Sequence, residues 1–202
     1  MPGVVVLVVA YVVGAVPFSN IAARRARGVD LRTVGSGTVS GTSLYRVAGF
    51  VPLALAGMCD VAKGSVGPLL AGTGRPGLAA VAGGLAVAGH NWSPFLRGAG
   101  GRGISTAMGA LAVTAWPGAV MLLAGLAVGR LVGQTALVSL VAEVLLVPLL
   151  AVLGWDGAAL AGLCVTVPML AKRLVGNAAP TGDRSRTYLM RLLFDRDEYA
   201  AS

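Results

Sequence analysis

The sequence predicts an all-α integral membrane protein with about seven transmembrane helices, its amino terminus outside and its carboxyl terminus in the cytoplasm. Three observations predict this class. The 202-residue chain is 56% hydrophobic and 12% charged, with a mean hydropathy of +0.81, which is more apolar than a soluble domain of this size. Apolar stretches recur along its length, and basic residues gather in alternate connections between them. Together these features favour a bundle in which short or broken helices surround the site.

Seven apolar stretches define the elements in order, and each is predicted to be a membrane helix. They span approximately residues 4–23, 47–72, 78–91, 103–116, 117–131, 133–154 and 157–172. Several are shorter than the roughly 20 residues that a perpendicular crossing needs. Broken helices are tolerated at membrane depth only where protein or water covers their backbone, so residues 78–116 are predicted to be irregular and enclosed. The first stretch has neither a basic segment before it nor a convincing cleavage site, which favours a retained helix over a signal peptide.

The basic residues predict the orientation, because cytoplasmic connections are enriched in lysine and arginine. With about seven crossings, only Arg75 falls in an outer loop. The cytoplasmic group comprises Arg24, Arg25, Arg27, Arg32, Arg46, Arg97, Arg102, Arg130, Lys172, Arg173, Arg184, Arg186, Arg191 and Arg196. A net charge of +8 also occurs in nucleic-acid-binding proteins, but aromatic residues are only 5% of this chain and are not interleaved with the basic ones. No nucleic-acid partner is expected, and no protein partner is identified.

Residues 1–177 are predicted to form one polytopic membrane domain, followed by a basic cytoplasmic tail at 178–202. Two interpretations of the tail are open. It can contain a short surface helix at about 186–194, or it can stay loosely ordered near anionic lipid.

Three ionisable residues interrupt the apolar stretches. Asp60 and Lys63 stand three apart and share a helix face, so they can pair. Such a pair either orients the second helix or lends Lys63 to an anionic substrate. Glu143 has no obvious partner in the sequence and is interpreted as structural or interfacial.

Two predicted cytoplasmic connections are rich in glycine and hydroxyl groups: VGSGTVSGTSLYR at 34–46 and GHNWSPFLRGAGGRGIST at 89–106. Glycines let successive backbone N–H groups surround an anion, especially where a helix follows. Glycine also serves tight turns and close helix packing. Arg102 would add a positive charge and Thr106 a hydroxyl group. His90 would act either as a proton acceptor or as a hydrogen-bond donor to phosphate. The pattern favours recognition of anionic substrates and group transfer at the membrane surface, without a metal or other cofactor.

At these residues the sequence resembles a known family. YVVGAVPFSNIAARRARGVDLRTVGSGTVSGTS, DVAKG and GHNWSPFLRGAGGRGIST occur in the order found in the acyl-phosphate:glycerol-3-phosphate acyltransferases, the PlsY family. The likeness covers most of residues 10–177. It implies seven membrane helices in the bacterial plasma membrane, with the active face in the cytoplasm. It also implies transfer of a fatty acyl group from acyl phosphate to glycerol 3-phosphate, giving 1-acylglycerol 3-phosphate (lysophosphatidic acid) and phosphate, the first step of phospholipid synthesis.

The first two family motifs map onto this chain residue by residue. The first, GSGNxGxTN, is matched by Gly35, Ser36, Gly37 and Thr42, and its remaining positions hold Thr38, Ser40 and Ser43; Arg46 stands where the family has a following arginine. The second, GHxxPxFLxFKGGKGVAT, is matched by Gly89, His90, Phe95, Leu96, Gly100, Gly101, Gly103 and Thr106. Its two lysines are replaced by Ala99 and Arg102, and a guanidinium keeps the charge but offers a planar fork.

The third motif, approximately RHxxN, retains Arg173 and Asn177, with Leu174 in place of its histidine. Gly133 stands where the family has a serine before the sixth helix. The chain is therefore identified as a divergent member.

The resemblance implies roles for the matched residues. Catalytic roles are expected for His90, Ser36 and Asn177. Substrate binding is expected for Gly35, Gly37, Thr38, Thr42, Arg46, Lys63, Gly100, Gly101, Arg102, Gly103, Thr106 and Arg173. Since both substrates carry phosphate, we expect Arg102, Ser36, His90 and Arg46 to converge on one cavity.

Two functions from different classes remain open. The chain is either an active acyltransferase, or a catalytically impaired relative that binds a phosphorylated lipid or assists another membrane protein.

Overall fold

A computed structural model of the chain describes residues 1–35, 37–180 and 183–195. Within these ranges the regular structure is helical, with no strand. The helices are α1 (Gly3–Gly14), α2 (Phe18–Arg27), α3 (Gly41–Ala48), α4 (Phe50–Ala71), α5 (Pro76–Asn91), α6 (Ile104–Thr114), α7 (Trp116–Leu131), α8 (Thr135–Leu153), α9 (Ala158–Val175) and α10 (Arg184–Phe194). Two short 3₁₀ turns lie at Leu31–Thr33 and Pro94–Leu96.

Every predicted apolar stretch contains a helix, and the all-helical class is confirmed. In the described part of the chain, four segments are long and apolar enough to cross a membrane, namely α1 with α2, α4, α8 and α9. Helices α6 and α7 are apolar but shorter.

The prediction that residues 78–116 are irregular was too broad. Most of that range folds as α5 and α6, and the irregular part is limited to the connection between them, residues 92–103. This connection is enclosed only in part: Ser93, Gly100, Gly101 and Gly103 are buried, whereas Pro94, Phe95, Arg97 and Gly98 are exposed. The many glycines of this region do not break the helices but let them pack closely.

Close backbone contact holds α4 against α6. A Cβ placed on Gly109 of α6 would lie 1.8 Å from the carbonyl oxygen of Val61, and one on Gly64 of α4 would lie 2.0 Å from that of Thr106. Small residues at such positions are the usual means of joining membrane helices, because the lipid offers no hydrophobic drive for association. The contact fixes the start of α6, directly after the second glycine-rich connection.

Proline and a broken span shape the amino-terminal part. Pro17 separates α1 from α2, because proline supplies no N–H to continue the first helix.

A small apolar cluster lies behind the first glycine-rich segment and is made by Ala23, Leu31, Val39, Leu44, Ala56 and Leu96. This cluster joins α2, α3 and α4 to the 3₁₀ turn within the second glycine-rich segment.

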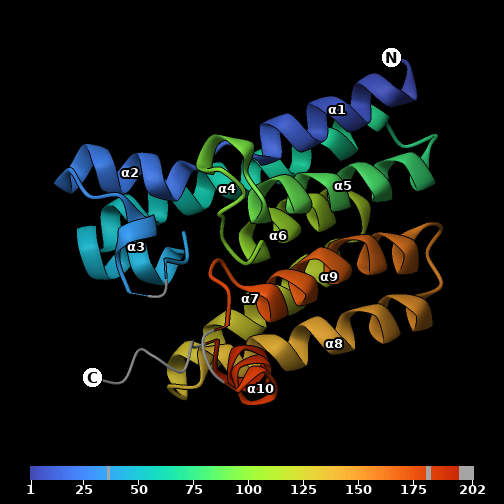
Figure 1. Cartoon of the computed structure of the whole chain (residues 1–202). Coiled ribbons are helices and arrows are strands. Elements are labelled where there is room, and N and C mark those ends of the chain that lie inside the picture. The colour runs from blue at the N-terminus through green and yellow to red at the C-terminus, as the bar shows by residue number, and fades with distance from the viewer. Residues whose placement is uncertain (36, 181–182, 196–202) are drawn as a thin grey trace.

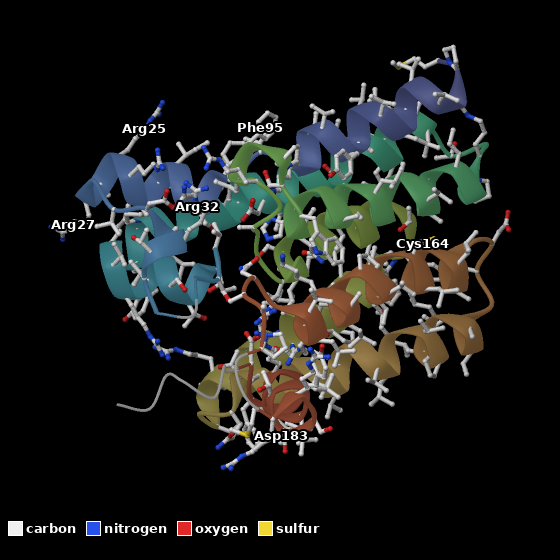
Figure 2. The ribbon with its side chains drawn as sticks, in the orientation of Figure 1. Arg25, Arg27, Arg32, Phe95, Cys164 and Asp183 are labelled. Atoms are coloured by element: carbon white, nitrogen blue, oxygen red, sulfur yellow. The ribbon has the colours of Figure 1, made fainter. Side chains whose placement is uncertain are left out.

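The charges separate along the bundle. Figure 2 shows Arg25 and Arg27 projecting from α2 at one end of the molecule. The amino terminus and the α4–α5 and α8–α9 connections lie at the opposite end (Figure 1). Segments that the positive-inside argument assigned to opposite faces therefore lie at opposite ends of the bundle, and which end faces the cytoplasm stays a prediction.

The helix predicted in the tail is confirmed as α10, and the described part of the tail is not loosely ordered. Thr187 and Arg191 of α10 are buried, and the helix packs on α8 and α9. The Arg191 guanidinium donates to the carbonyl oxygens of Val175 at 2.6 Å and Ala178 at 2.8 Å. The bond to Val175 also satisfies one of the carbonyl groups at the end of α9, which a helix leaves without intrahelical partners.

Candidate functional site

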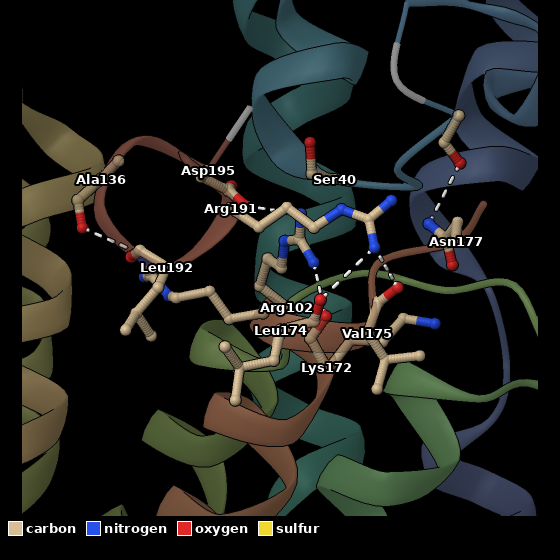
Figure 3. Close-up of polar contacts among 12 residues, drawn as sticks. Ser40, Arg102, Ala136, Lys172, Leu174, Val175, Asn177, Arg191, Leu192 and Asp195 are labelled. Atoms are coloured by element: carbon tan, nitrogen blue, oxygen red, sulfur yellow. Dashed lines mark hydrogen bonds and ion pairs between the residues drawn. The ribbon is translucent and has the colours of Figure 1, made fainter. Parts of the chain in front are cut away.

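One side chain joins the three segments that the sequence singled out. The Asn177 amide nitrogen donates to the carbonyl oxygens of Gly37 at 3.2 Å and Gly100 at 2.9 Å. Its oxygen accepts from the N–H of Gly100 at 3.1 Å. Asn177 can reach them because α9 ends at Val175 and the chain turns at Gly176, which has a φ of 68°. Figure 3 shows Asn177 beyond this end of the helix. Gly37 and Gly100, which lie 140 and 77 residues before Asn177 in the sequence, are thus held together by three hydrogen bonds of its amide group.

The second glycine-rich segment folds tightly back on the end of α5. A Cβ on Gly101 would lie 2.3 Å from Nε2 of His90 and 2.7 Å from the carbonyl oxygen of Val39. The N–H of Gly101 donates to the carbonyl oxygen of His90 at 3.3 Å, and Gly100 accepts from the N–H of Val39 at 3.2 Å. The N–H groups of Gly100 and Gly101 are therefore engaged within the protein. This differs from the predicted cradle, in which both would face an anion.

Thr106 lies in the first turn of α6, just beyond the loop. Its side chain is fully buried, and its hydroxyl is among the buried polar atoms of the described chain without a hydrogen-bond partner. A buried hydroxyl usually has a partner, since leaving it unpaired is unfavourable. In this segment, the Thr106 hydroxyl and the free N–H groups expected at a helix start are therefore the groups that can still bind an anion.

His90, Lys63 and Asp60 form a buried cluster between α4 and α5. The Lys63 ammonium lies 2.7 Å from Asp60 Oδ1 and donates to the carbonyl oxygen of Val16 at 2.7 Å. Its third donor contacts Nδ1 of His90 at 2.9 Å. An ammonium can only donate, so Nδ1 accepts and the ring proton of a neutral His90 belongs on Nε2. That N–H points toward Gly101. This arrangement favours a role for His90 as a hydrogen-bond donor over a role as a proton acceptor.

Arg102 is turned toward α9 and α10. Its guanidinium donates to the carbonyl oxygen of Lys172 at 2.7 Å and pairs with the Asp195 carboxylate at 2.5 Å (Figure 3). The charge predicted for phosphate is thus held by a carboxylate from the end of α10. Nothing in the sequence pattern indicated this pairing.

Arg173 and Glu143 form a second buried ion pair, at 3.0 Å. Arg173 also donates to the carbonyl oxygens of Ala136 at 2.9 Å and Leu192 at 3.3 Å. Glu143 therefore has a partner and a structural role, in agreement with the interpretation made from the sequence. The contacts of Arg173 lie on α8 and α10, away from the glycine-rich segments.

The connection before the first glycine-rich segment is fixed by Asp30. Its carboxylate accepts from Arg32 at 2.7 Å and from Arg24 at 2.5 Å, and the hydrogen bonds from Arg32 hold the pKa of Asp30 well below its usual range despite partial burial. Arg32 also donates to the carbonyl oxygen of Leu96 at 3.4 Å. The connection before the first glycine-rich segment is therefore hydrogen-bonded to the second segment at Leu96. This link adds to the hydrogen bonds that Asn177 makes to both segments.

The expected convergence of four side chains is met only in part. His90 lies against the second glycine-rich segment, whereas Arg102 contacts α9 and Asp195. Arg46 is exposed on α3, as is Thr42, while Thr38 is buried. Gly35 is exposed with φ 56°, and Ser36 lies outside the described residues.

A pocket of about 400 Å³ opens beside this junction. It is bordered by the second glycine-rich segment at Gly98, by Asn177, and by Tyr188 of α10. Lys172 and Trp92 also border it. Sequence reasoning assigned neither residue to a site, because Lys172 was counted only as a topological charge. A second, apolar pocket of about 470 Å³ lies between α4 and α6, lined by Gly57, Met58, Val61, Ala62, Ser105 and Met108.

Comparison with known proteins supplies a family. The sequence profile of the glycerol-3-phosphate acyltransferases matches residues 4–177. Among curated relatives, the glycerol-3-phosphate acyltransferase of Chlorobaculum tepidum is 39% identical over 61 residues, 30% of this chain and 26% of that protein. That of Carboxydothermus hydrogenoformans is 40% identical over 67 residues, 31% of this chain and 34% of that protein. The matched segments thus span about a third or less of these relatives.

Solved structures share the fold. A crystal structure of PlsY, an integral membrane glycerol 3-phosphate acyltransferase, in its glycerol 3-phosphate form superposes with a TM-score of 0.78 and 24% identity, covering 98% of this chain and 95% of that one. A second structure, the lysophosphatidic acid form, gives a TM-score of 0.76 at 21% identity. At such identities the likeness establishes the fold.

Proposed function

Since the chain belongs to the glycerol-3-phosphate acyltransferase family, we propose that it transfers a fatty acyl group from acyl phosphate to glycerol 3-phosphate. The products are 1-acylglycerol 3-phosphate and phosphate. The observation that carries this proposal is the junction at Asn177 of the third motif, which makes one hydrogen bond to Gly37 of the first motif and two to Gly100 of the second. Three segments that are distant in sequence thus meet at one point, as residues that build one site must.

The same proposal includes the membrane topology. Four segments long enough to span, together with α5, α6 and α7, make seven crossings with the amino terminus outside and the tail from residue 178 in the cytoplasm. The separation of charge in Figure 2 supports this orientation. The active face is then cytoplasmic, at a bacterial plasma membrane, where a water-soluble acceptor can meet a lipid donor.

The chemistry needs no nucleophile from the protein. A hydroxyl oxygen of glycerol 3-phosphate forms the new ester bond to the acyl carbon, the bond from that carbon to the phosphate oxygen breaks, and phosphate leaves with the electron pair. The hydroxyl proton passes to the departing phosphate or to water. Holding two reactants in position can supply about 7–11 kcal/mol of such a barrier. The protein's task is thus to bind two anions close together.

The residues are assigned accordingly. His90, with its Nε2–H toward Gly101, donates a hydrogen bond to a phosphate oxygen, and Thr106 offers a buried hydroxyl at the start of α6. Arg102 serves the same anion when it leaves Asp195. Ser36 and Arg46 are assigned to the acceptor by their place in the first motif. The acyl chain is assigned to the apolar pocket between α4 and α6, which Ser105 and Met108 place next to Thr106.

A time course of phosphate release from palmitoyl phosphate tests the proposal, using purified protein in uncharged detergent with and without glycerol 3-phosphate. We expect release to depend on glycerol 3-phosphate and to match formation of lysophosphatidic acid one to one. Binding of glycerol 3-phosphate without any release would contradict transfer and support the impaired relative instead.

A further inference from the structure

Lys172 is a buried cation without a counter-charge among the described residues. Lys63 pairs with Asp60, Arg173 with Glu143 and Arg102 with Asp195. No ion pair among the described residues includes Lys172, although its side chain is fully buried. Burying an ammonium without compensation is strongly unfavourable, so such a group calls for a ligand.

The contacts of the Lys172 ammonium leave most of its capacity unused. It donates to the carbonyl oxygen of Gly98 at 3.4 Å, a long hydrogen bond, and lies 5.4 Å from the centre of the Trp92 ring. An ammonium has three donors. The cation–π contact offsets part of the desolvation but uses none of them. Lys172 can therefore donate to an anion without giving up a strong bond.

The pocket beside Lys172 suits a small phosphate ester. Of the described residues that line it, none is acidic, and Arg97 adds a second positive charge at its rim. Asn177 and Tyr188 border it with an amide and a phenol, which can bind hydroxyl groups. A volume of about 400 Å³ exceeds what glycerol 3-phosphate needs, and the pocket is lined by the connection between α5 and α6, the end of α9 and the start of α10.

We propose that Lys172 binds the phosphate group of glycerol 3-phosphate in this pocket. The assignment rests on the proposed function and adds a residue that none of the three motifs contains. It also accounts for Ala99, which stands where the second motif has a lysine. The ammonium of Lys172 reaches residue 98 of the same loop from α9, so the positive charge at this point comes from a different helix.

Steady-state kinetics of Lys172→Met test this assignment by comparing the two phosphate-bearing substrates, glycerol 3-phosphate and palmitoyl phosphate. We expect the KM for glycerol 3-phosphate to rise about ten- to a hundredfold, the loss expected for one charge-assisted hydrogen bond. The KM for palmitoyl phosphate should change less than threefold, and the effect should fall on KM more than on kcat. Arg184→Gln is the matched control, because it removes one positive charge from an exposed position on α10; its KM values should equal those of the wild type.

Thermal unfolding in phosphate-free, uncharged detergent provides a readout that does not need transfer. Without ligand, Lys172→Met should unfold at or above the wild-type temperature, because it removes an uncompensated buried charge. Glycerol 3-phosphate should raise the unfolding temperature of the wild type and of Arg184→Gln, but not that of Lys172→Met.

The outcomes separate the two proposals. If the wild type forms no lysophosphatidic acid, the proposed function fails, and the unfolding shifts alone decide the role of Lys172. An unchanged KM for glycerol 3-phosphate in Lys172→Met, or an equal ligand shift in Lys172→Met and wild type, would overturn the assignment. So would a rise confined to the KM for palmitoyl phosphate, which would move Lys172 to the donor site.

Discussion

At the scale of single residues, the His90 cluster shows what spacing alone can predict. The interval between Asp60 and Lys63 places both on one helix face, and their pairing at 2.7 Å confirms the prediction. Spacing left open whether Lys63 was structural or available to substrate. The structure adds His90 as its third partner, and this contact depends on the packing of α5 against α4, which no local pattern encodes.

Removing one charge of the cluster should destabilise the fold more than removing both. Lys63→Met leaves the Asp60 carboxylate buried, and we expect a loss of about 3–5 kcal/mol in unfolding free energy. The double variant Asp60→Asn/Lys63→Met should regain most of it. Transfer should stay low in both, because Lys63 no longer fixes the His90 proton on Nε2. Denaturant unfolding in detergent and the transfer assay check the two parts; wild-type transfer by the double variant would refute the role given to His90.

Gly101 should not tolerate a side chain. In Gly101→Ala the new Cβ would lie 2.3 Å from Nε2 of His90 and 2.7 Å from a backbone oxygen. We expect displacement of His90 and a loss of transfer of about a hundredfold per folded molecule, the scale of a misplacement near 1 Å. Gly77→Ala is the control, since nothing lies within 4 Å of its Cβ and the helix gains propensity. Equal activity of both variants would show that the loop does not position the site.

At the scale of elements, the sequence located the helices but misjudged residues 78–116. Apolar stretches too short for a perpendicular crossing were interpreted as irregular, yet α5 and α6 are continuous helices, and their glycines lie at helix contacts, as Gly109 does against Val61. Sequence cannot distinguish a glycine that breaks a helix from one that admits a neighbour. The distinction depends on which helix lies opposite.

Helix α10 was predicted, but its contact with the loop was not. Asp195 neutralises Arg102, so Asp195→Asn should leave Arg102 free for an anion. We expect the KM for acyl phosphate to fall by about threefold or more, with less than about 1 kcal/mol of change in stability, because the pair is partly exposed.

Asp183→Asn supplies the control for this variant. It alters the amino-terminal cap of the same helix, whose side chain accepts from Ser185 and Arg186, but leaves Arg102 paired. An acyl phosphate KM unchanged or raised in Asp195→Asn would mean that Arg102 does not serve the donor.

At the scale of the whole molecule, hydropathy and charge were enough for the fold. All seven apolar stretches contain helices, and the arginines of α2 lie at one end of the bundle. The orientation that the positive-inside rule gives stays a prediction. The site was predictable only as three segments. Which side chains join them depended on the turn at Gly176 and on the packing of α9 against α5, which bring Asn177 to Gly100.

Cysteine labelling tests the orientation. In a background with Cys59 and Cys164 replaced by alanine, Arg75→Cys should react with an impermeant maleimide in intact cells, and Arg25→Cys should react only after the membrane is opened. These positions lie at opposite ends of the bundle. Labelling of position 25 from outside would reverse the topology and place the site on the wrong face for a cytoplasmic acceptor.

The central claim is that the junction at Asn177 is the site of acyl transfer, and Asn177→Asp tests it most directly. This variant keeps the size and the acceptor toward Gly100 but loses the two N–H donors to Gly37 and Gly100. Gln134→Glu makes the same chemical change at an exposed position between α7 and α8. We predict that lysophosphatidic acid formation per folded molecule falls about a hundredfold or more in Asn177→Asp and is unchanged in Gln134→Glu. Equal rates in the two variants would contradict the account.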